Sequence, residues 1–193
     1  MMDCHPTPNR GNLAAPKLPV FPEQSVPVGS AAEIKEVLSP RVAVIPGGQF
    51  VAKSGNVETI RGLGNSDYAA TVWPLDLKAY NAMDGAEMPP YADYDVPVLK
   101  GQNTITVRAL CSFPLNTGYD LRVAIALPDR QPQVISVMTK AMNNYGNNWH
   151  KTVLKGYSPA EVIFESPQDT TIRLRVYFMD PGLVINDLYV TAV

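Results

Sequence analysis

From Arg41 onward, apolar and polar residues alternate with a period of two in several short runs. The clearest runs lie at residues 104–111, 121–127, 172–178 and 184–190. Successive side chains of a β-strand point to opposite faces, so each run has one apolar face and one mixed face. The apolar sets are Ile105, Val107, Ala109 and Cys111; Leu121, Val123, Ile125 and Leu127; Ile172, Leu174, Val176 and Phe178; and Val184, Asn186, Leu188 and Val190.

Four shorter apolar runs complete the set of expected strands, at residues 42–45, 69–73, 134–138 and 160–164. Turn-forming residues separate the runs, for example Asp180-Pro181-Gly182 before the last one. About eight short strands with this spacing predict an all-β fold. We expect an antiparallel two-sheet β-sandwich, of jelly-roll or galactose-binding type, in which the two sheets bury their apolar faces against each other.

The first 40 residues differ in composition from the rest of the chain. Residues 1–29 hold six of the 18 prolines and show no steady apolar period. Proline fixes φ and lacks an amide donor, so this Pro-rich segment is expected to be an extended linker or tail. Residues 30–40 are expected to form a short helix or connector, capped at Ser30 and stopped by Pro40. The β-sandwich domain is then expected at residues 41–193.

Composition and charge exclude several classes of protein. The formal net charge of −2 provides no basic field for nucleic-acid binding. No apolar run reaches the roughly 18 residues of a membrane-spanning helix. Residues 1–12 contain no apolar stretch of the kind that a signal peptide requires. With only Cys4 and Cys111, a disulfide framework is not expected to organise the fold.

The sequence offers few residues for catalysis. His5 and His150 are its only histidines, too few for a zinc site built from His and Cys, and a nucleophilic triad would depend on His150 alone. No phosphate-binding glycine loop follows a predicted strand. We therefore expect no enzymatic activity from this chain by itself.

Several short phrases, in a fixed order, resemble a known family. They include Gly62-Leu63-Gly64-Asn65-Ser66, Pro90-Tyr91-Ala92-Asp93-Tyr94-Asp95 and Leu121-Arg122-Val123-Ala124-Ile125-Ala126-Leu127. Over residues 41–193 the chain resembles the C-terminal β-sandwich domain of family 115 glycoside hydrolases, the xylan α-glucuronidases. The resemblance implies a non-catalytic accessory module of a bacterial enzyme, similar to carbohydrate-binding modules, with the catalytic centre in other domains.

The resemblance also implies partners and a location. The implied ligand is a plant cell-wall polysaccharide or oligosaccharide of the xylan type, bound or positioned by the module. Domains of this kind are associated with subunit contacts, so a homo-oligomer or packing against a catalytic domain is the other implied partner. The parent protein is implied to be periplasmic or extracellular, although this chain shows no signal peptide.

No cofactor is expected. Related sugar-binding sandwiches hold a structural calcium ion with acidic residues of their first strand. The matching stretch here, residues 44–50, contains no acid. Calcium takes six to eight oxygen ligands, several of them carboxylates, so this sequence does not favour a calcium site.

The first candidate sugar site is the Asn-rich segment at residues 143–150. Aromatic rings stack on the apolar face of a pyranose, and side-chain amides bind its hydroxyls. The alternative is that the tryptophan closes the core while the asparagines form a solvated turn. The candidate residues are Asn144, Tyr145, Asn147, Asn148 and Trp149.

The second candidate cluster lies just after two prolines. Tyr91, Asp93 and Asp95 share one side of an extended chain, so the two acids would converge on a cation or on sugar hydroxyls. The alternative is the entrance of a strand, with Tyr94 in the core and both acids in water.

Four arginines lie on the polar faces of expected strands: Arg108, Arg122, Arg173 and Arg175. On neighbouring strands they would bind the carboxylate of a uronic acid. The alternative is that they pair with acids on an exposed sheet face.

Two functions therefore remain open. One is a carbohydrate-binding accessory module. The other is a structural or oligomerisation module that packs through an exposed apolar face, to which the mixed strand faces would contribute Leu110, Ile185 and Tyr189.

Overall fold

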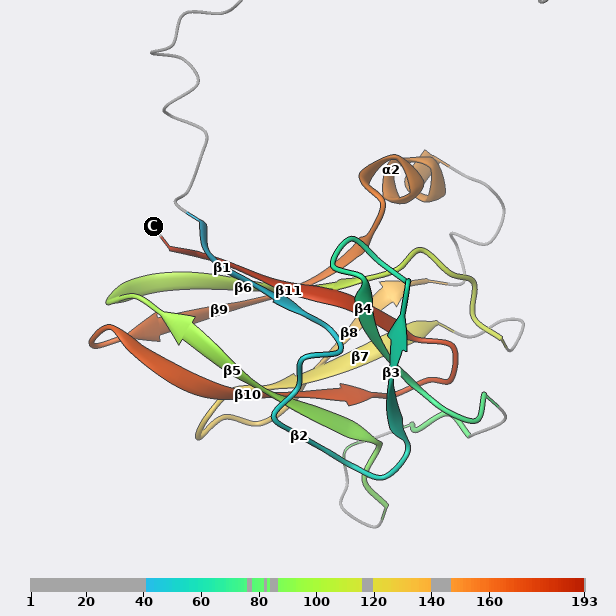
Figure 1. Cartoon of the computed structure of the whole chain (residues 1–193), viewed down its shortest axis with the longest axis horizontal. Helices are drawn as coiled ribbons and strands as arrows, with labels where there is room; N and C mark the ends of the chain where they lie inside the picture. The colour runs from blue at the N-terminus through green and yellow to red at the C-terminus, as the bar shows by residue number, and fades with distance from the viewer. Residues whose placement is uncertain are drawn as a thin grey trace, which may run out of the picture. The chain divides into compact units, whose positions relative to one another are not determined.

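The computed structural model describes residues 41–75, 78–81, 83, 87–115, 120–139 and 147–192, except for the side chains of Arg41 and of residues 147–149. The Pro-rich segment and the connector predicted at residues 1–40 lie outside this range and stay predictions. Within it, two antiparallel sheets lie one above the other (Figure 1), so the predicted all-β sandwich is confirmed.

Sheet A contains six strands. In spatial order, five of them are β3 (Val57–Arg61), β4 (Tyr68–Val72), β11 (Val184–Ala192), β6 (Gly101–Ala109) and β9 (Ser158–Ser166). The sixth, β1 (Arg41–Pro46), also pairs with β11. This pairing sets Arg41 opposite Thr191, so the start of β1 lies beside the end of β11 at one corner of the sheet.

Sheet B contains five strands. Their spatial order is β2 (Ala52–Lys53), β5 (Tyr91–Val98), β10 (Thr170–Phe178), β7 (Leu121–Ala126) and β8 (Gln133–Met138). The sequence predicts only an extended entrance where β5 forms, and this strand contains a proline, Pro97. Proline is tolerated here because β2 pairs only with Ala92 and Asp93, which leaves Pro97 on an open edge.

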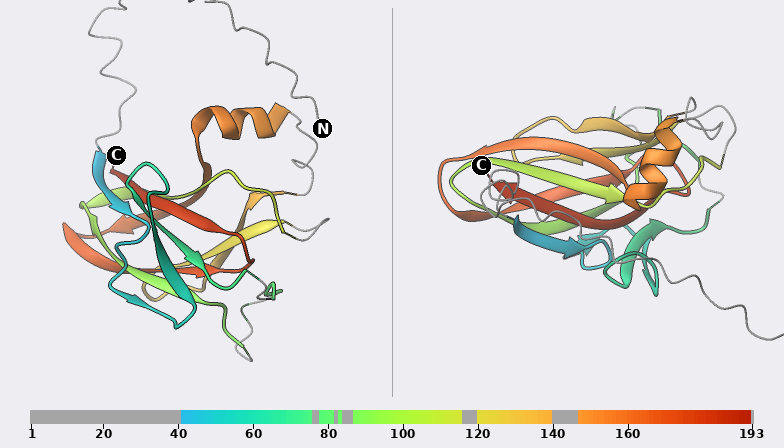
Figure 2. Two further views of the ribbon diagram at one scale, coloured as in Figure 1. Left: turned by 45° about the vertical axis from the view of Figure 1, so that its right-hand side comes forward. Right: turned by 90° about the horizontal axis from the view of Figure 1, so that it is seen from above.

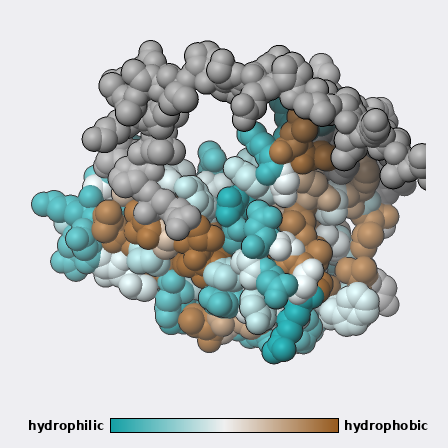
Figure 3. All heavy atoms as spheres, turned by 45° about the horizontal axis from the view of Figure 1, so that its top comes forward, coloured by the Kyte–Doolittle hydropathy of each residue, from teal (hydrophilic) through white to brown (hydrophobic). Residues whose placement is uncertain are grey.

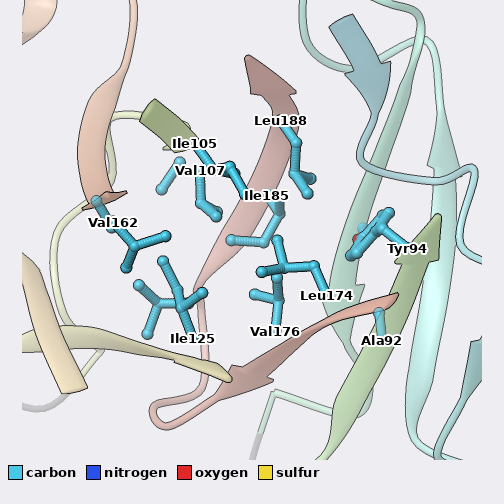
Figure 4. Close-up of a cluster of buried hydrophobic side chains, with 14 of the residues drawn as sticks. Ala92, Tyr94, Ile105, Val107, Ile125, Val162, Leu174, Val176, Ile185 and Leu188 are labelled. Atoms are coloured by element: carbon cyan, nitrogen blue, oxygen red, sulfur yellow. The ribbon is translucent and has the colours of Figure 1, made fainter. Parts of the chain in front are cut away.

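The core lies between the two sheets and is built from the alternating residues that the sequence predicts. Ile105, Leu174 and Val176 are fully buried, and the hydroxyl of the buried Tyr94 donates a hydrogen bond of 2.7 Å to the carbonyl of Gly47. Figure 4 shows the facing rows of apolar side chains. From sheet A these are Ile105, Val107, Ile185 and Leu188, and from sheet B they are Ile125, Leu174 and Val176.

A β-bulge in β11 changes which residues enter the core. The register against β6 shifts between Ile185 and Asp187, so residues before and after the bulge follow different phases. Ile185, expected on the exposed mixed face, is therefore fully buried, whereas Val184, expected in the core, is half-buried. Leu110 and Tyr189 are half-buried. Because Ile185 is fully buried, the exposed apolar face predicted from Leu110, Ile185 and Tyr189 is not formed.

A short helix, α2 (Asn147–Lys155), stands outside the sandwich at one end (Figure 2). The Asn-rich segment at residues 143–150 is expected to be a loop, and this expectation is wrong for residues 147–150, which form the start of the helix. The signal that marks the helix is Gly156, which has a φ of +77° and whose amide donates to the carbonyl of Thr152 at 3.0 Å. Such a left-handed glycine is a common C-terminal cap. No helix in the described residues could span a membrane.

Candidate functional site

The strands β5 and β10 bring a band of polar and aromatic side chains to the outer face of sheet B. The register sets Arg175 opposite Asp93 and Arg173 opposite Asp95. One step further along, Tyr177 lies opposite Tyr91. The predicted cluster of Tyr91, Asp93 and Asp95 thus does share one face, and it is matched there by two of the four arginines.

Arg175 and Asp93 form a bidentate ion pair on this face. The Nε–Oδ1 distance is 2.7 Å and the Nη2–Oδ2 distance is 2.9 Å. The guanidinium carbon lies 3.8 Å from the centre of the Tyr91 ring and 5.9 Å from that of Tyr177. The hydrogen bonds to Asp93 raise the pKa of Arg175 above its usual value. This arginine is therefore charged and held in one orientation by an acid and an aromatic ring.

The two acids of the cluster differ in exposure. The side chain of Asp93 is only 6% exposed, so the prediction that both acids lie in water is wrong for Asp93. Asp95 is 47% exposed and accepts a hydrogen bond of 2.7 Å from Nε of Arg173, which is itself 54% exposed. Within the described part of the chain, the terminal amino groups of Arg173 make no hydrogen bond. They are free to bind a ligand.

An open cavity of about 340 Å³ adjoins this polar band. This volume is at the lower end of the range for ligand pockets, roughly 300–1,000 Å³. One wall is polar and aromatic, and consists of Asp93, Arg173, Arg175 and Tyr177. The other wall is apolar, and consists of Ala126, Leu127 and Pro128 at the end of β7.

The opposite end of the same face is covered by the segment that precedes β5. Tyr80 and Met83 pack against a small apolar cluster that includes the fully buried Met179, and the amide of Tyr80 donates to the carbonyl of Met179 at 2.8 Å. Arg122 donates to the Tyr80 carbonyl and to both carboxylate oxygens of Asp180. These contacts fill one end of the face and leave the cavity at the other end.

Sheet A carries a similar arginine pair on its outer face. Arg108 forms a bidentate ion pair with Asp187, and its guanidinium lies 5.0 Å from the ring centres of both Tyr157 and Tyr189. Burial lowers the pKa of Arg108, but the hydrogen bond and charge of Asp187 outweigh it, so that the pKa is raised. All four predicted arginines thus pair with acids, as the second of the two interpretations requires.

The structure leaves the Asn-rich candidate site untested. Asn144 and Tyr145 lie outside the described residues. Asn147, Asn148 and Trp149 begin α2, but their side chains are also outside the described set.

Sequence reasoning missed the aromatic and apolar walls of the cavity. Tyr177 is not among the candidates predicted from the sequence. It alternates in phase with Arg173 and Arg175 along one strand, and this alternation indicates that all three side chains share the outer face. Ala126, Leu127 and Pro128 give no such signal, because their role depends on β7 lying next to β10.

The acid-free stretch at residues 44–50 runs from β1 into the following turn, and its two glycines are held by backbone hydrogen bonds. The amide of Gly47 donates to the carbonyl of Asn186 at 2.8 Å, and that of Gly48 to the carbonyl of Tyr68 at 2.9 Å. A Cβ atom on Gly47 would lie 2.1 Å from the carbonyl oxygen of Ile185, so only glycine fits. Across the described residues, no group of three His, Cys, Asp or Glu side chains is placed to hold a metal ion.

The two packed antiparallel sheets define a β-sandwich with the fold of carbohydrate-binding modules. A family 35 carbohydrate-binding module from Clostridium thermocellum superposes with a TM-score of 0.51 at 14% identity, over 78% of this chain and 99% of that one. The family is identified from the sequence profile of the glycosyl hydrolase family 115 C-terminal domain, which matches residues 44–192. The chain belongs to this domain family, and the resemblance seen in the sequence is confirmed.

Part of a family 115 enzyme shares the fold. The enzyme is a 4-O-methyl-α-glucuronidase with specificity for decorated arabinogalactans, with a TM-score of 0.61 and 16% identity. The match covers 80% of this chain but only 18% of the enzyme. No curated protein matches the sequence. Residues 44–192 thus correspond to the C-terminal domain of this family and have the fold of carbohydrate-binding modules.

Proposed function

We propose that this domain is a non-catalytic module that binds plant cell-wall glycan of the xylan type in the cavity on the outer face of sheet B. The observation that carries the proposal is the Arg175–Asp93 pair, held against Tyr91 at the edge of a cavity of about 340 Å³. By analogy with its family, the parent protein would work in the periplasm or outside the cell, where this polymer is found.

The chemistry of the two walls suits a sugar ring. A pyranose has hydroxyl groups that both donate and accept hydrogen bonds, and a less polar face formed by its C–H groups. The guanidinium and carboxylate groups of one wall supply donors and acceptors side by side. The apolar part of the lining, with Ala126 and the exposed Pro128, supplies the apolar contact.

Affinity electrophoresis tests the proposal, with the purified chain run in gels that contain glucuronoxylan, arabinoxylan, pectin or no polysaccharide. We expect retardation by a xylan, and loss of this retardation in Arg175→Gln. The matched control is Arg61→Gln, which removes an arginine that lies 6.0 Å from the Tyr68 ring on sheet A. Equal mobility in every gel would contradict the proposal. Retardation that Trp149→Ala abolishes and Arg175→Gln does not would instead assign the site to the Asn-rich segment.

The second candidate function is a structural module that packs against another domain or a second copy. The observation that favours it is the pair of exposed apolar residues near the end of α2, where Leu154 is 87% exposed and Val153 is 47% exposed. Elsewhere the hydrophobic side chains on the face shown in Figure 3 form separate patches, interrupted by hydrophilic residues. Sedimentation velocity tests this function. A dimer that Leu154→Lys dissociates would support it, and a monomer would count against self-association.

A further inference from the structure

The charges around the cavity cancel. Its lining contains two cations, Arg173 and Arg175, and one anion, Asp93. The fourth charge is Asp95, which accepts a hydrogen bond from Arg173 directly beside the cavity. Two positive and two negative groups leave this part of the described surface with no formal net charge.

Arg175 already donates two hydrogen bonds to an acid. Arg175 uses Nε and Nη2 to bind both carboxylate oxygens of Asp93. These two contacts occupy the Nε–Nη2 edge of the guanidinium group and leave its Nη1–Nη2 edge for a ligand. A ligand carboxylate at that edge meets a guanidinium group whose charge the adjacent Asp93 already balances, so charge alone does not favour a carboxylate over a hydroxyl group there.

Arg173 does not provide a selective anion site either. Its terminal amino groups are available, but its side chain is 54% exposed and Asp95 is bonded to its Nε. An exposed pair of this kind is screened by water and salt, so its attraction for a further anion is weak. A hydroxyl group fits better, because it accepts from a guanidinium N–H and donates to a carboxylate oxygen at the same time.

We propose that the cavity recognises a neutral pyranose unit of the glycan and does not select for acidic substituents on it. This inference rests on the proposed function and specifies which part of the polymer the domain binds. The domain would then attach its parent enzyme to undecorated stretches of the polysaccharide, and leave the acidic side groups unbound.

Isothermal titration calorimetry with two oligosaccharides tests the inference. One is a linear neutral xylo-oligosaccharide, and the other is the same chain with one glucuronic acid side group. We expect dissociation constants that agree within about twofold, and that change by less than about twofold between low salt and about 0.5 M NaCl. Binding of the acidic ligand alone, or at least about tenfold tighter and weakened by salt, would overturn the inference and leave the proposed function intact. Binding of neither would refute both.

A charge variant provides a second test. Asp95→Asn leaves Arg173 without its counter-ion and gives the cavity region a net positive charge. We expect the ratio of acidic-ligand to neutral-ligand affinity to rise at least about threefold at low salt, and this rise to disappear at high salt. Glu58→Gln is the matched control, because it adds the same charge on sheet A, where Glu58 is 55% exposed. A ratio that stays unchanged in Asp95→Asn would show that charge balance does not control selectivity, and would overturn the inference.

Discussion

The outer faces of the two sheets carry the same arrangement in two different environments. Arg108–Asp187 on sheet A and Arg175–Asp93 on sheet B are both bidentate pairs across neighbouring strands, each flanked by two tyrosines. The sheet A pair is enclosed, with side chains 17% and 1% exposed, whereas those of the sheet B pair are 38% and 6% exposed. The sheet A pair is therefore buried and stabilises the fold. The sheet B pair keeps an accessible edge of the Arg175 guanidinium group, to which a ligand could bind.

The difference arises from the residues beside each pair. On sheet A, Asp187 also accepts a hydrogen bond of 2.9 Å from Asn186, and Tyr157 covers the guanidinium group of Arg108. On sheet B, the neighbouring strand β7 presents Ala126 next to Arg175. A small side chain in this place leaves the cavity open. Binding at the proposed site would thus depend on the small side chain of Ala126 as well as on the charged pair.

The largest expected effect is on the enclosed pair. Asp187→Asn removes the charge that compensates Arg108 in a mostly buried position, and we expect it to cost about 3 kcal/mol of the free energy of unfolding. Urea denaturation followed by tryptophan fluorescence measures this loss. A loss below about 1 kcal/mol would mean that Arg108 reaches water, and that the two pairs do not differ as described.

The same substitution on sheet B is expected to act mainly on binding. Asp93→Asn should cost only about 1 kcal/mol of unfolding free energy, because the partly exposed Arg175 can turn toward water. Glycan retardation in affinity electrophoresis should be lost. If Asp93→Asn destabilises as much as Asp187→Asn, the distinction between a structural pair and a binding pair fails.

Removal of the aromatic support should have a smaller effect on the fold. Tyr91→Leu keeps apolar contact but removes the ring that lies 3.8 Å from Arg175. We expect a loss of about 0.5–1 kcal/mol in unfolding free energy, together with weaker glycan binding. Tyr68→Leu, on sheet A, is the control, since its ring also lies near an arginine but is expected to leave binding unchanged.

The smallest expected effect on stability comes from filling the cavity. Ala126→Leu adds a side chain toward open space, so the free energy of unfolding should change by less than about 0.5 kcal/mol. Glycan affinity should fall at least about tenfold in calorimetry, because the sugar and the new side chain compete for one volume. Unchanged affinity would show that the ligand binds elsewhere.

The sequence predicts the strand faces well because a period of two depends only on local geometry. Leu174 and Val176 point into the core, and Arg173 and Arg175 point out, as their alternation requires. The alternation fails at the bulge near Ile185, because one extra residue in β11 shifts which side chains face the core. Nothing in the local composition indicates this shift. The helix at Asn147–Lys155 was missed because its Asn-rich start is more typical of a turn.

The candidate site was only half predictable. Tyr91 and Asp93 share a face in any extended chain, so their grouping follows from the sequence. Their partner Arg175 is 82 residues away from Asp93, and no local pattern sets the register that joins them. The cavity wall at Ala126 depends on a third strand, and it is therefore visible only in the folded chain.

The pairing of Arg41 with Thr191 has a mechanical consequence. Both ends of the domain leave from the same corner, on adjacent antiparallel strands whose hydrogen bonds run perpendicular to the chain. Tension applied through the two ends would load these bonds one at a time, as in a zipper, and not all together in shear. Under such tension β1 would peel from β11 at low force, while the cavity between β5, β10 and β7 would remain intact on the other sheet.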